Sequence, residues 1–404
     1  MRRLPLYLLL LSLPLGVAGQ NIGGTVAGLI LLWQLWLQRR EVDFAGMWAR
    51  CRTPLVAALA LLGVLVVATL LNPRNPARYN ETFVGGHLLW LFVPPVVWLV
   101  QPRLAARDWQ GLFHFLAGVS VFMTIVALSQ NVWGWALGPG GIVSVPARAH
   151  GLYSHPMSLA YVSVLLFPLG CTAVFRYPRY VAAWTLALSS LICVFASGSR
   201  TVEAVSIGVL VVQVFIFVRG RARLALLGVM TAALLALAVT HNPVSQRFYG
   251  MLTHHDVHVD YPDDRFAFWQ ANFDMFLERP LIGHGDNLNT QYRSRYYDAI
   301  GLHDFVRQYE AHNMYLQVAV NAGILGLLAF LVWLVWHLKL AVWLMRRPAS
   351  EFAGHAAMAT LIALMLAALT QNAFQDSAVR YTLTALVTGL WLAARDLAPH
   401  SKSS

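Results

Sequence analysis

Residues 312–345 read HNMYLQVAVNAGILGLLAFLVWLVWHLKLAVWLM, and this stretch decides the fold class. From Met314 onward it holds a single charged residue, Lys339. A helix that crosses a bilayer needs about 20 mostly apolar residues. The stretch is long enough and apolar enough to be such a helix, and it begins at a histidine and an asparagine.

The same apolar pattern recurs along the whole chain. Hydrophobic residues make up 58% of the 404 residues and charged residues only 12%, a composition typical of multi-span membrane proteins. We therefore predict an all-α polytopic membrane protein with about twelve transmembrane helices. The predicted spans are Leu4–Val17, Ile22–Leu37, Pro54–Leu71, His87–Val100, Gly111–Ser129, Met157–Phe175, Val181–Ala196, Val202–Val218, Leu224–Val239, Asn313–Met345, His355–Leu369 and Tyr381–Ala394.

These spans divide the chain into four predicted parts. Residues 1–240 carry the first nine helices, and residues 241–311 form a large, partly helical loop. Residues 312–396 carry the last three helices, and residues 397–404 form a short tail. An even number of spans places both termini on the same side of the membrane.

Basic residues give the orientation, because Lys and Arg in short loops resist translocation. With the N-terminus inside, eighteen of the 29 basic residues fall in cytoplasmic segments and five in short outer loops. The long loop then faces outward and the tail is cytoplasmic. The net charge of +11 follows from this topology and gives no indication of nucleic-acid binding.

Cysteines and metal-binding patterns contribute little. Three cysteines, two of them inside predicted spans, are typical of small buried side chains rather than of a disulfide framework. The best metal candidates are the cluster His254–His258 and the pair Asp263 and Asp264, and a solvated loop and a turn explain them better. We therefore predict no metal site and no cofactor.

Polar residues gather where the turn Ser197–Thr201 joins two predicted spans on the outer face. The next helix begins about there, and a helix start offers unpaired amide groups and a positive dipole potential. Ser199 and Arg200 would add a hydroxyl and a guanidinium, which together favour an anion such as phosphate. The alternative is that Ser199 caps the helix while Arg200 pairs with Glu203 or reaches lipid headgroups.

Two further polar segments are predicted on the same face. The turn RAHGLYSHP, residues 148–156, carries Arg148, Tyr153 and His155 just before a span. In the long loop, Arg265 begins an amphipathic stretch with aromatic residues at helical spacing, which ends at the run PLIGHG, residues 280–285. We predict a helix there, stopped by that run.

His312 directly precedes the predicted span Asn313–Met345. At 100° per residue, His312, Gly323 and Gly326 share one face, where small residues would let another helix or a lipid chain approach. Asn313 begins a polar stripe that repeats every four residues and should line an interior space. A histidine there could serve as a general base, although helix packing with a hydrogen-bonded His is an alternative.

These motifs resemble bacterial O-antigen ligases and the wider ligase and polymerase superfamily. The resemblance rests on His312-Asn313 followed after nine residues by Gly323-x-x-Gly326, on Ser199-Arg200 and Arg265, and on the run at 280–285. It covers essentially the whole chain. The turn at 148–156 is also similar, except that His155 stands where asparagine is frequent in the family.

The resemblance implies a metal-independent, inverting glycosyltransferase at the periplasmic face. The donor would be O-antigen glycan on undecaprenyl diphosphate, and the acceptor a lipid A core oligosaccharide, with membrane lipids around both. His312 would be the catalytic base, and Arg200 and Arg265 would bind the diphosphate. Arg148, Ser199, Asn313 and Tyr153 would contribute to substrate binding, and Gly323 and Gly326 to helix packing.

Three other functions remain open at this point. An O-antigen polymerase would join the same donor to another lipid-linked glycan, and a protein O-oligosaccharyltransferase would transfer it to protein. A transporter or flippase for lipid-linked glycan belongs to a different class. Against it, the inner halves of the spans hold few charges and the chain shows no internal repeat.

Overall fold

In a computed structural model of the chain, the apolar stretch that follows His312 and Asn313 forms a long helix, α13 (Met314–Met345). The structure describes residues 3–72, 82–138, 141–144, 148–239, 264–286, 290–300 and 310–397. Before α13 come α1 (Leu4–Ser12), α2 (Val17–Gln38), α3 (Phe44–Leu71), α4 (Thr82–Val100), α5 (Ala106–Trp133), α6 (Pro156–Arg176), α7 (Val181–Ser197), α8 (Arg200–Phe217), α9 (Gly220–Val239), α11 (Asp264–Glu278) and α12 (Thr290–Ala299). After it come α14 (Glu351–Ala367), the 3₁₀ turn η2 (Ala373–Gln375) and α15 (Ser377–Asp396).

One short hairpin interrupts the helices. Strands β1 (Trp135–Gly138) and β2 (Gly141–Ser144) pair antiparallel, with Trp135 opposite Ser144. The expectation of an all-α chain is therefore confirmed for the main architecture and wrong for this hairpin. Gly134, with a φ of 67°, ends α5 in the left-handed conformation that glycine adopts easily and turns the chain into β1.

A helix lies within each of the twelve predicted spans, but not every helix can cross a membrane alone. Among the residues that the structure describes, five helices are long and apolar enough to do so: α3, α5, α6, α8 and α13. The nine residues of α1 rise only about 14 Å, less than half of a hydrocarbon core of about 30 Å. The chain is a polytopic helical membrane protein, and the number twelve stays a prediction.

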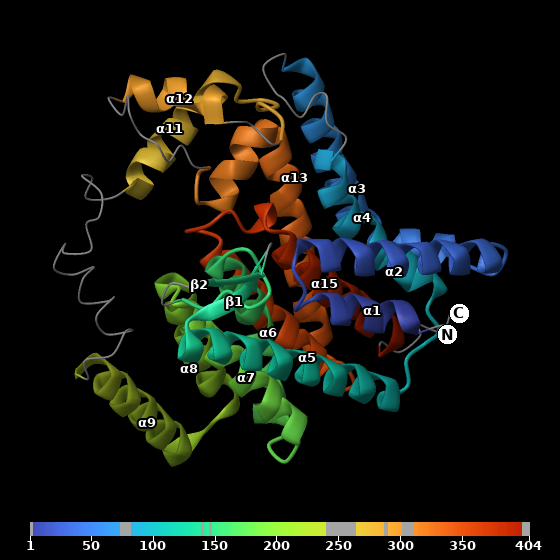
Figure 1. Cartoon of the computed structure of the whole chain (residues 1–404). Coiled ribbons are helices and arrows are strands. Elements are labelled where there is room, and N and C mark those ends of the chain that lie inside the picture. The colour runs from blue at the N-terminus through green and yellow to red at the C-terminus, as the bar shows by residue number, and fades with distance from the viewer. Residues whose placement is uncertain are drawn as a thin grey trace.

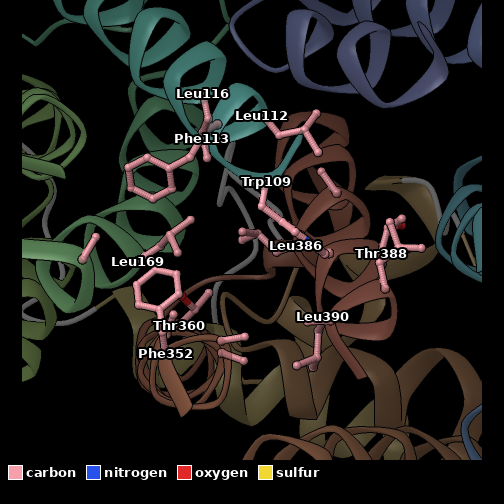
Figure 2. A pocket seen from close by; sticks show the side chains of 18 of the residues that line it. Trp109, Leu112, Phe113, Leu116, Leu169, Phe352, Thr360, Leu386, Thr388 and Leu390 are labelled. Carbon is pink, nitrogen blue, oxygen red and sulfur yellow. The ribbon is translucent and has the colours of Figure 1, made fainter. Parts of the chain in front are cut away.

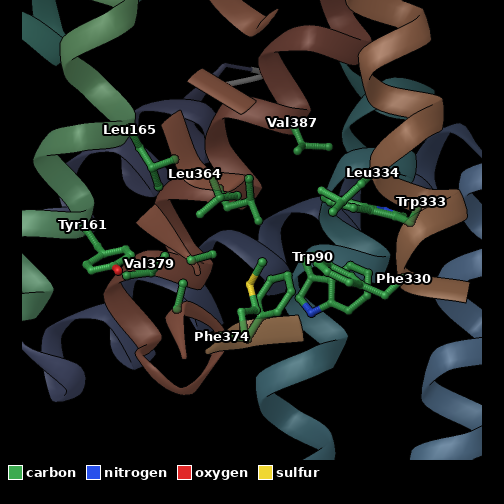
Figure 3. Packing of buried hydrophobic residues seen from close by; sticks show 14 of the residues in the cluster. Trp90, Tyr161, Leu165, Phe330, Trp333, Leu334, Leu364, Phe374, Val379 and Val387 are labelled. Atoms are coloured by element: carbon green, nitrogen blue, oxygen red, sulfur yellow. The ribbon is translucent and has the colours of Figure 1, made fainter. Parts of the chain in front are cut away.

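An aromatic cluster fixes the position of the turn between α14 and α15 (Figure 3). Trp90 of α4 lies edge to face against Trp333 of α13, with 5.5 Å between the ring centroids. Phe330, one turn earlier on α13, makes a similar contact with Phe374 of η2 at 5.3 Å. Buried aromatic pairs of this kind add to the free energy of area burial. The η2 segment is thus packed against the side of α13.

The helix bundle has two ends, which we call the site end and the far end. At the site end, α7 gives way to α8 and α13 begins at Met314, and α11 and α12 lie together against this part of α13 (Figure 1). At the far end, α5 begins and α15 ends. There Arg3 forms an ion pair with Asp108, and Arg395 forms one with Asp396. The two ends of the chain therefore lie at the same end of the bundle.

Candidate functional site

Helix α13 is broken at Gly323, and the run at 280–285 fills the break. Gly323 has φ 64° and ψ −166°, which interrupts the helical hydrogen bonds. The amide groups of Ile324 and Leu325, which start the lower half, donate to the carbonyls of Pro280 and Leu281. The carbonyls at the end of the upper half accept from the amides of residues 284 and 285. The two motifs are one structural unit, in which each supplies the hydrogen bonds that the other lacks.

This arrangement corrects the expected roles of the two glycines. A Cβ atom on Gly323 would lie 2.3 Å from the carbonyl carbon and oxygen of Leu281, so the glycine admits loop backbone and not a neighbouring helix. Gly326 does face a helix, since a Cβ there would lie 3.2 Å from Leu61 of α3, but it would also lie 2.0 Å from Ala322. Because the helix is broken, the prediction that His312 shares a face with both glycines is wrong.

The polar stripe of α13 is occupied by contacts within the protein. Asn313 is the N-cap of the helix, and its side-chain oxygen accepts from the amides of Tyr315 and Leu316. Gln317 donates to Asn321, and Asn321 donates to Asp286 at 3.0 Å. The stripe therefore holds the segment after the run at 280–285. The contacts of Asn313 give it a structural role as the cap.

His312 precedes the helix and is held on two sides. Its φ of 44° makes it the one non-glycine residue with positive φ in the part of the chain that the structure describes. Phe268 of α11 stacks on its ring, with the centroids 5.2 Å apart. On the other side, Nδ1 lies 2.6 Å from Oε1 of Gln371. Because an amide oxygen only accepts, Nδ1 carries the proton, and Nε2 is the acceptor of the neutral ring.

The residue after Gln371 makes a second contact with the segment around His312. Asn372 donates to a carboxylate oxygen of Glu310 at 2.6 Å. Arg293 of α12 lies 3.5 Å from the other oxygen of that carboxylate. Burial raises the pKa of Glu310, and Arg293 opposes that effect. The turn between α14 and α15 therefore grips the chain on both sides of Ala311, and α12 is tied to the same place.

The turn that carries Arg148 docks on the end of α7. Nε of Arg148 donates to the carbonyl of Ser197 at 2.9 Å, and the amide of Ala149 donates to the carbonyl of Ala196. Gln130 of α5 holds the other side of this turn by accepting from the amides of residues 150 and 151. The predicted convergence of this turn with the Ser197–Thr201 turn is confirmed by these contacts.

Ser199 and Arg200 form the start of α8. Ser199 is the N-cap by position, is buried, and makes no side-chain capping bond. Arg200 is the first helical residue and is partly buried. Both follow within three residues of Ser197, which Arg148 contacts. The guanidinium of Arg148 thus lies beside the N-terminus of the helix that Arg200 begins, which favours an anion.

His155 connects this region to His312. It is the N-cap of α6, where Nδ1 accepts from the amide of Met157 at 3.1 Å. Burial lowers the pKa of His155, the charges of Arg148 and His312 lower it further, and Asp376 opposes them. Ser158, three residues after His155, donates to Asp376, which follows Gln371, the partner of His312, by five residues. The three motifs that are distant in sequence are therefore connected at the site end of the bundle.

The remaining candidates are placed as follows. Arg265 lies in the first turn of α11, three residues before Phe268, and its side chain is outside the described residues. The hydroxyl of Tyr153 donates to the carbonyl of Leu13 at 2.6 Å and is buried, which gives it a structural role. His254–His258 and Asp263 lie outside the described residues, and no group of three metal-binding side chains occurs among those within them.

Residues 185–331 match the family model described as O-antigen ligase. The matched segment covers about a third of the chain and is similar to O-antigen ligases. This similarity supports membership of the O-antigen ligase and polymerase superfamily. The matched segment includes Arg200, Arg265, His312 and Gly323, and excludes Arg148 and Gln371. A comparison with curated proteins found no match to the chain.

Sequence reasoning missed the residues that position His312. Gln371, Asn372 and Asp376 follow a predicted span in a short polar stretch, TQNAFQDS, residues 370–377. Asp376 caps α15 and accepts a hydrogen bond from Ser158 of α6. The only available signal was this density of amide and acid groups at the end of a span, because nothing in the spacing connects it to His312.

Proposed function

We propose that the chain is an O-antigen ligase. In this reaction O-antigen glycan moves from undecaprenyl diphosphate to a sugar of the lipid A core oligosaccharide, with inversion at the anomeric carbon. The observation that carries the proposal is the contact of His312 with Gln371, in which Nδ1 lies 2.6 Å from the amide oxygen Oε1. This contact favours the tautomer with the proton on Nδ1, which leaves Nε2 as the acceptor. A positioned imidazole in this tautomer suits a general base.

The bonds and charges of the reaction fit the residues at the site end. An acceptor hydroxyl attacks the anomeric carbon and loses its proton to Nε2 of His312. The bond from that carbon to the diphosphate breaks, and the diphosphate leaves with the electron pair. Its developing charge needs donors that are in place beforehand. Arg148 and Arg200 can supply them, and Arg265 can add a third, since it lies one helical turn from the Phe268 that stacks on His312.

The reaction, as proposed, takes place at the periplasmic face of the inner membrane and uses neither nucleotide sugar nor a metal or other cofactor. Eighteen basic residues against five in the short loops support this orientation, and it places the far end of the bundle in the cytoplasm. A reporter that is active only in the periplasm, inserted within residues 241–263, should be active, and the same reporter after Ser404 should be silent. The opposite pattern would reverse the assignment of faces.

Deletion of the gene tests the function itself. A strain that lacks a ligase keeps long glycan on the lipid carrier and makes lipopolysaccharide with bare core. Loss of a polymerase leaves core that bears one repeat unit, and loss of a protein O-oligosaccharyltransferase leaves lipopolysaccharide unchanged. Loss of a flippase leaves the glycan on the cytoplasmic side. We expect the first result, and any of the others would replace the proposal.

A further inference from the structure

A cavity lies within the bundle, and His312 is not among its lining residues. It has a volume of about 610 Å³ and lies between α1, α5, α6, α14 and α15 (Figure 2). Leu112 and Phe113 of α5, Leu169 of α6 and Leu386 of α15 turn toward it (Figure 2). The hydroxyl of Thr360, one of the lining threonines, donates a hydrogen bond to the carbonyl of Leu165 on α6. The surface of this cavity is that of a hydrocarbon site.

The cavity begins at the far end of the bundle. Its outermost lining residues are Ala106 at the start of α5, Tyr177 at the end of α6, Phe352 at the start of α14 and Leu397 after α15. Its deepest lining residues include Leu116, ten residues into α5, and Thr382, five residues into α15, so the cavity extends far into the bundle. Arg148, Arg200, His155 and His312 are not among its lining residues.

Basic residues outnumber acidic residues at the helix ends that carry the outermost lining residues, which we call the mouth of the cavity. The helix ends there carry eight arginines against three acidic residues. Each of the three acids already pairs with an arginine: Asp108 with Arg3, Glu351 with Arg176 and Asp396 with Arg395. The arginines that make no ion pair within the described part of the chain are Arg103, Arg107, Arg179, Arg346 and Arg347.

We propose that the cavity binds an anionic glycerophospholipid, with an acyl chain inside the bundle and the headgroup phosphate among the arginines of the mouth. Basic pockets between transmembrane helices attract anionic headgroups, and long side chains reach the interface from helix ends. The cavity volume of about 610 Å³ lies within the usual range of ligand pockets in proteins. The undecaprenyl-linked donor is a poor fit, because its diphosphate has to reach the opposite end of the bundle.

The proposal is tested on the full-length purified protein, and it does not rest on the transfer reaction. The probe is phosphatidylglycerol, compared with phosphatidylcholine, added to the delipidated protein in detergent. Bound lipid is counted by native mass spectrometry, and the melting temperature is measured in parallel. We expect phosphatidylglycerol to bind in a defined ratio and to raise the melting temperature, and phosphatidylcholine to do neither.

Two variants address the two parts of the site. Ala357→Phe fills the cavity from α14 and should abolish retention of the lipid. Arg107→Gln combined with Arg179→Gln should weaken binding about thirtyfold, from roughly fivefold for each basic residue at an anionic surface. The matched controls are Ala60→Phe on an exposed face of α3 and Arg40→Gln after α2, which should behave as wild type.

Three results would overturn the proposal. Equal binding of both lipids would remove the anionic headgroup from it. Unchanged phosphatidylglycerol binding by the double arginine variant would remove the mouth, and this test stands even if Ala357→Phe does not fold. Equal loss in Arg40→Gln would show that only the total charge matters.

Discussion

Gln371 binds the Nδ1 proton of His312 across 2.6 Å, although 59 residues separate them in the chain. The contact joins the turn after α14 to the segment before α13. The contact fixes the rotation of the ring and favours the tautomer in which Nε2 carries no proton and can accept one. Phe268 stacks on a face of the ring. The preorganisation of the candidate base therefore depends on residues outside its own motif.

Changing Gln371 should affect the rate and its pH dependence separately. We expect Gln371→Leu to lower kcat about tenfold, because the loss of one hydrogen bond costs about 1 kcal/mol and the ring is no longer fixed. Gln371→Glu keeps the acceptor but adds a charge that stabilises the imidazolium. Its acid limb in a kcat profile should move to higher pH. A purely structural Gln371 would leave the profile in place in both variants.

Replacing His312 should separate its chemistry from its unusual backbone. Asparagine tolerates the positive φ of 44° better than alanine does. We therefore expect His312→Asn to reach normal levels in the membrane and to lose transfer at least about a hundredfold, the lower range for a lost general base. His312→Ala should lose activity equally and be less stable. Near-normal turnover in the asparagine variant would assign the base elsewhere.

The arginines should respond to the shape of the side chain as well as its charge. Lysine at Arg148 or Arg200 keeps the charge and loses the bidentate fork, so each lysine variant should fall between wild type and the alanine variant. Arg40→Lys at the other end of the bundle is the control. Transfer should persist in EDTA. Activity that disappears with the chelator and returns with a divalent ion would shift attention to His254–His258 and Asp263.

Gly323→Ala should damage the fold more than a glycine change usually does. Its backbone angles, φ 64° and ψ −166°, lie in a region that is essentially open to glycine only and costs other residues about 1–3 kcal/mol, and the added Cβ would strike backbone of Leu281 that cannot move aside. We expect a loss of about 3 kcal/mol, measured as a lower melting temperature and poor expression. Gly63→Ala is the matched control, because a Cβ there meets nothing within 4 Å. Equal behaviour of the two variants would refute the role of Gly323.

His155→Asn should make the protein less sensitive to acid. The pKa of His155 is lowered, mainly by burial, so below its ordinary value the unfolded chain takes up a proton that the native protein refuses. Stability is thus lost as pH falls from about 6.5 toward the native pKa. Asparagine caps a helix without titrating. The melting temperature between pH 7.5 and 5.5 should fall less in the variant, and an equal fall would contradict this.

The helices and the position of the site were predictable, and the reasons are local. Apolar runs such as the one in α6 and α13 decide helix and membrane by length and composition alone. Arg148, Arg200 and His312 were assigned to one face because successive spans alternate in direction and each of these residues lies at the outer end of a span. The structure joins these segments by contacts: Arg148 donates to Ser197, Ser158 donates to Asp376, and Gln371, in the same turn as Asp376, contacts His312.

The break in α13 and the partners of His312 were not predictable. Helical periodicity assumes an unbroken helix, so it put His312 and Gly323 on one face that does not exist. The run at 280–285 looked like a stop signal, since glycine and proline are normal at helix ends. Its hydrogen bonds to Ile324 and Leu325 are tertiary contacts, and a single sequence holds no period that reveals them.

The length of α13 sets the height of the chemistry above the membrane. The 22 residues below the break, from Ile324 to Met345, rise about 33 Å, which is enough to cross a hydrocarbon core of about 30 Å. Arg347 lies over the ring of Trp343 at the far end of this segment, as expected for a basic residue at a membrane boundary. In the proposed ligase, the part above the break, with His312 at its tip, then stands outside the hydrocarbon. The diphosphate of the donor would act as a spacer as well as a leaving group, because it lifts the anomeric carbon toward that height.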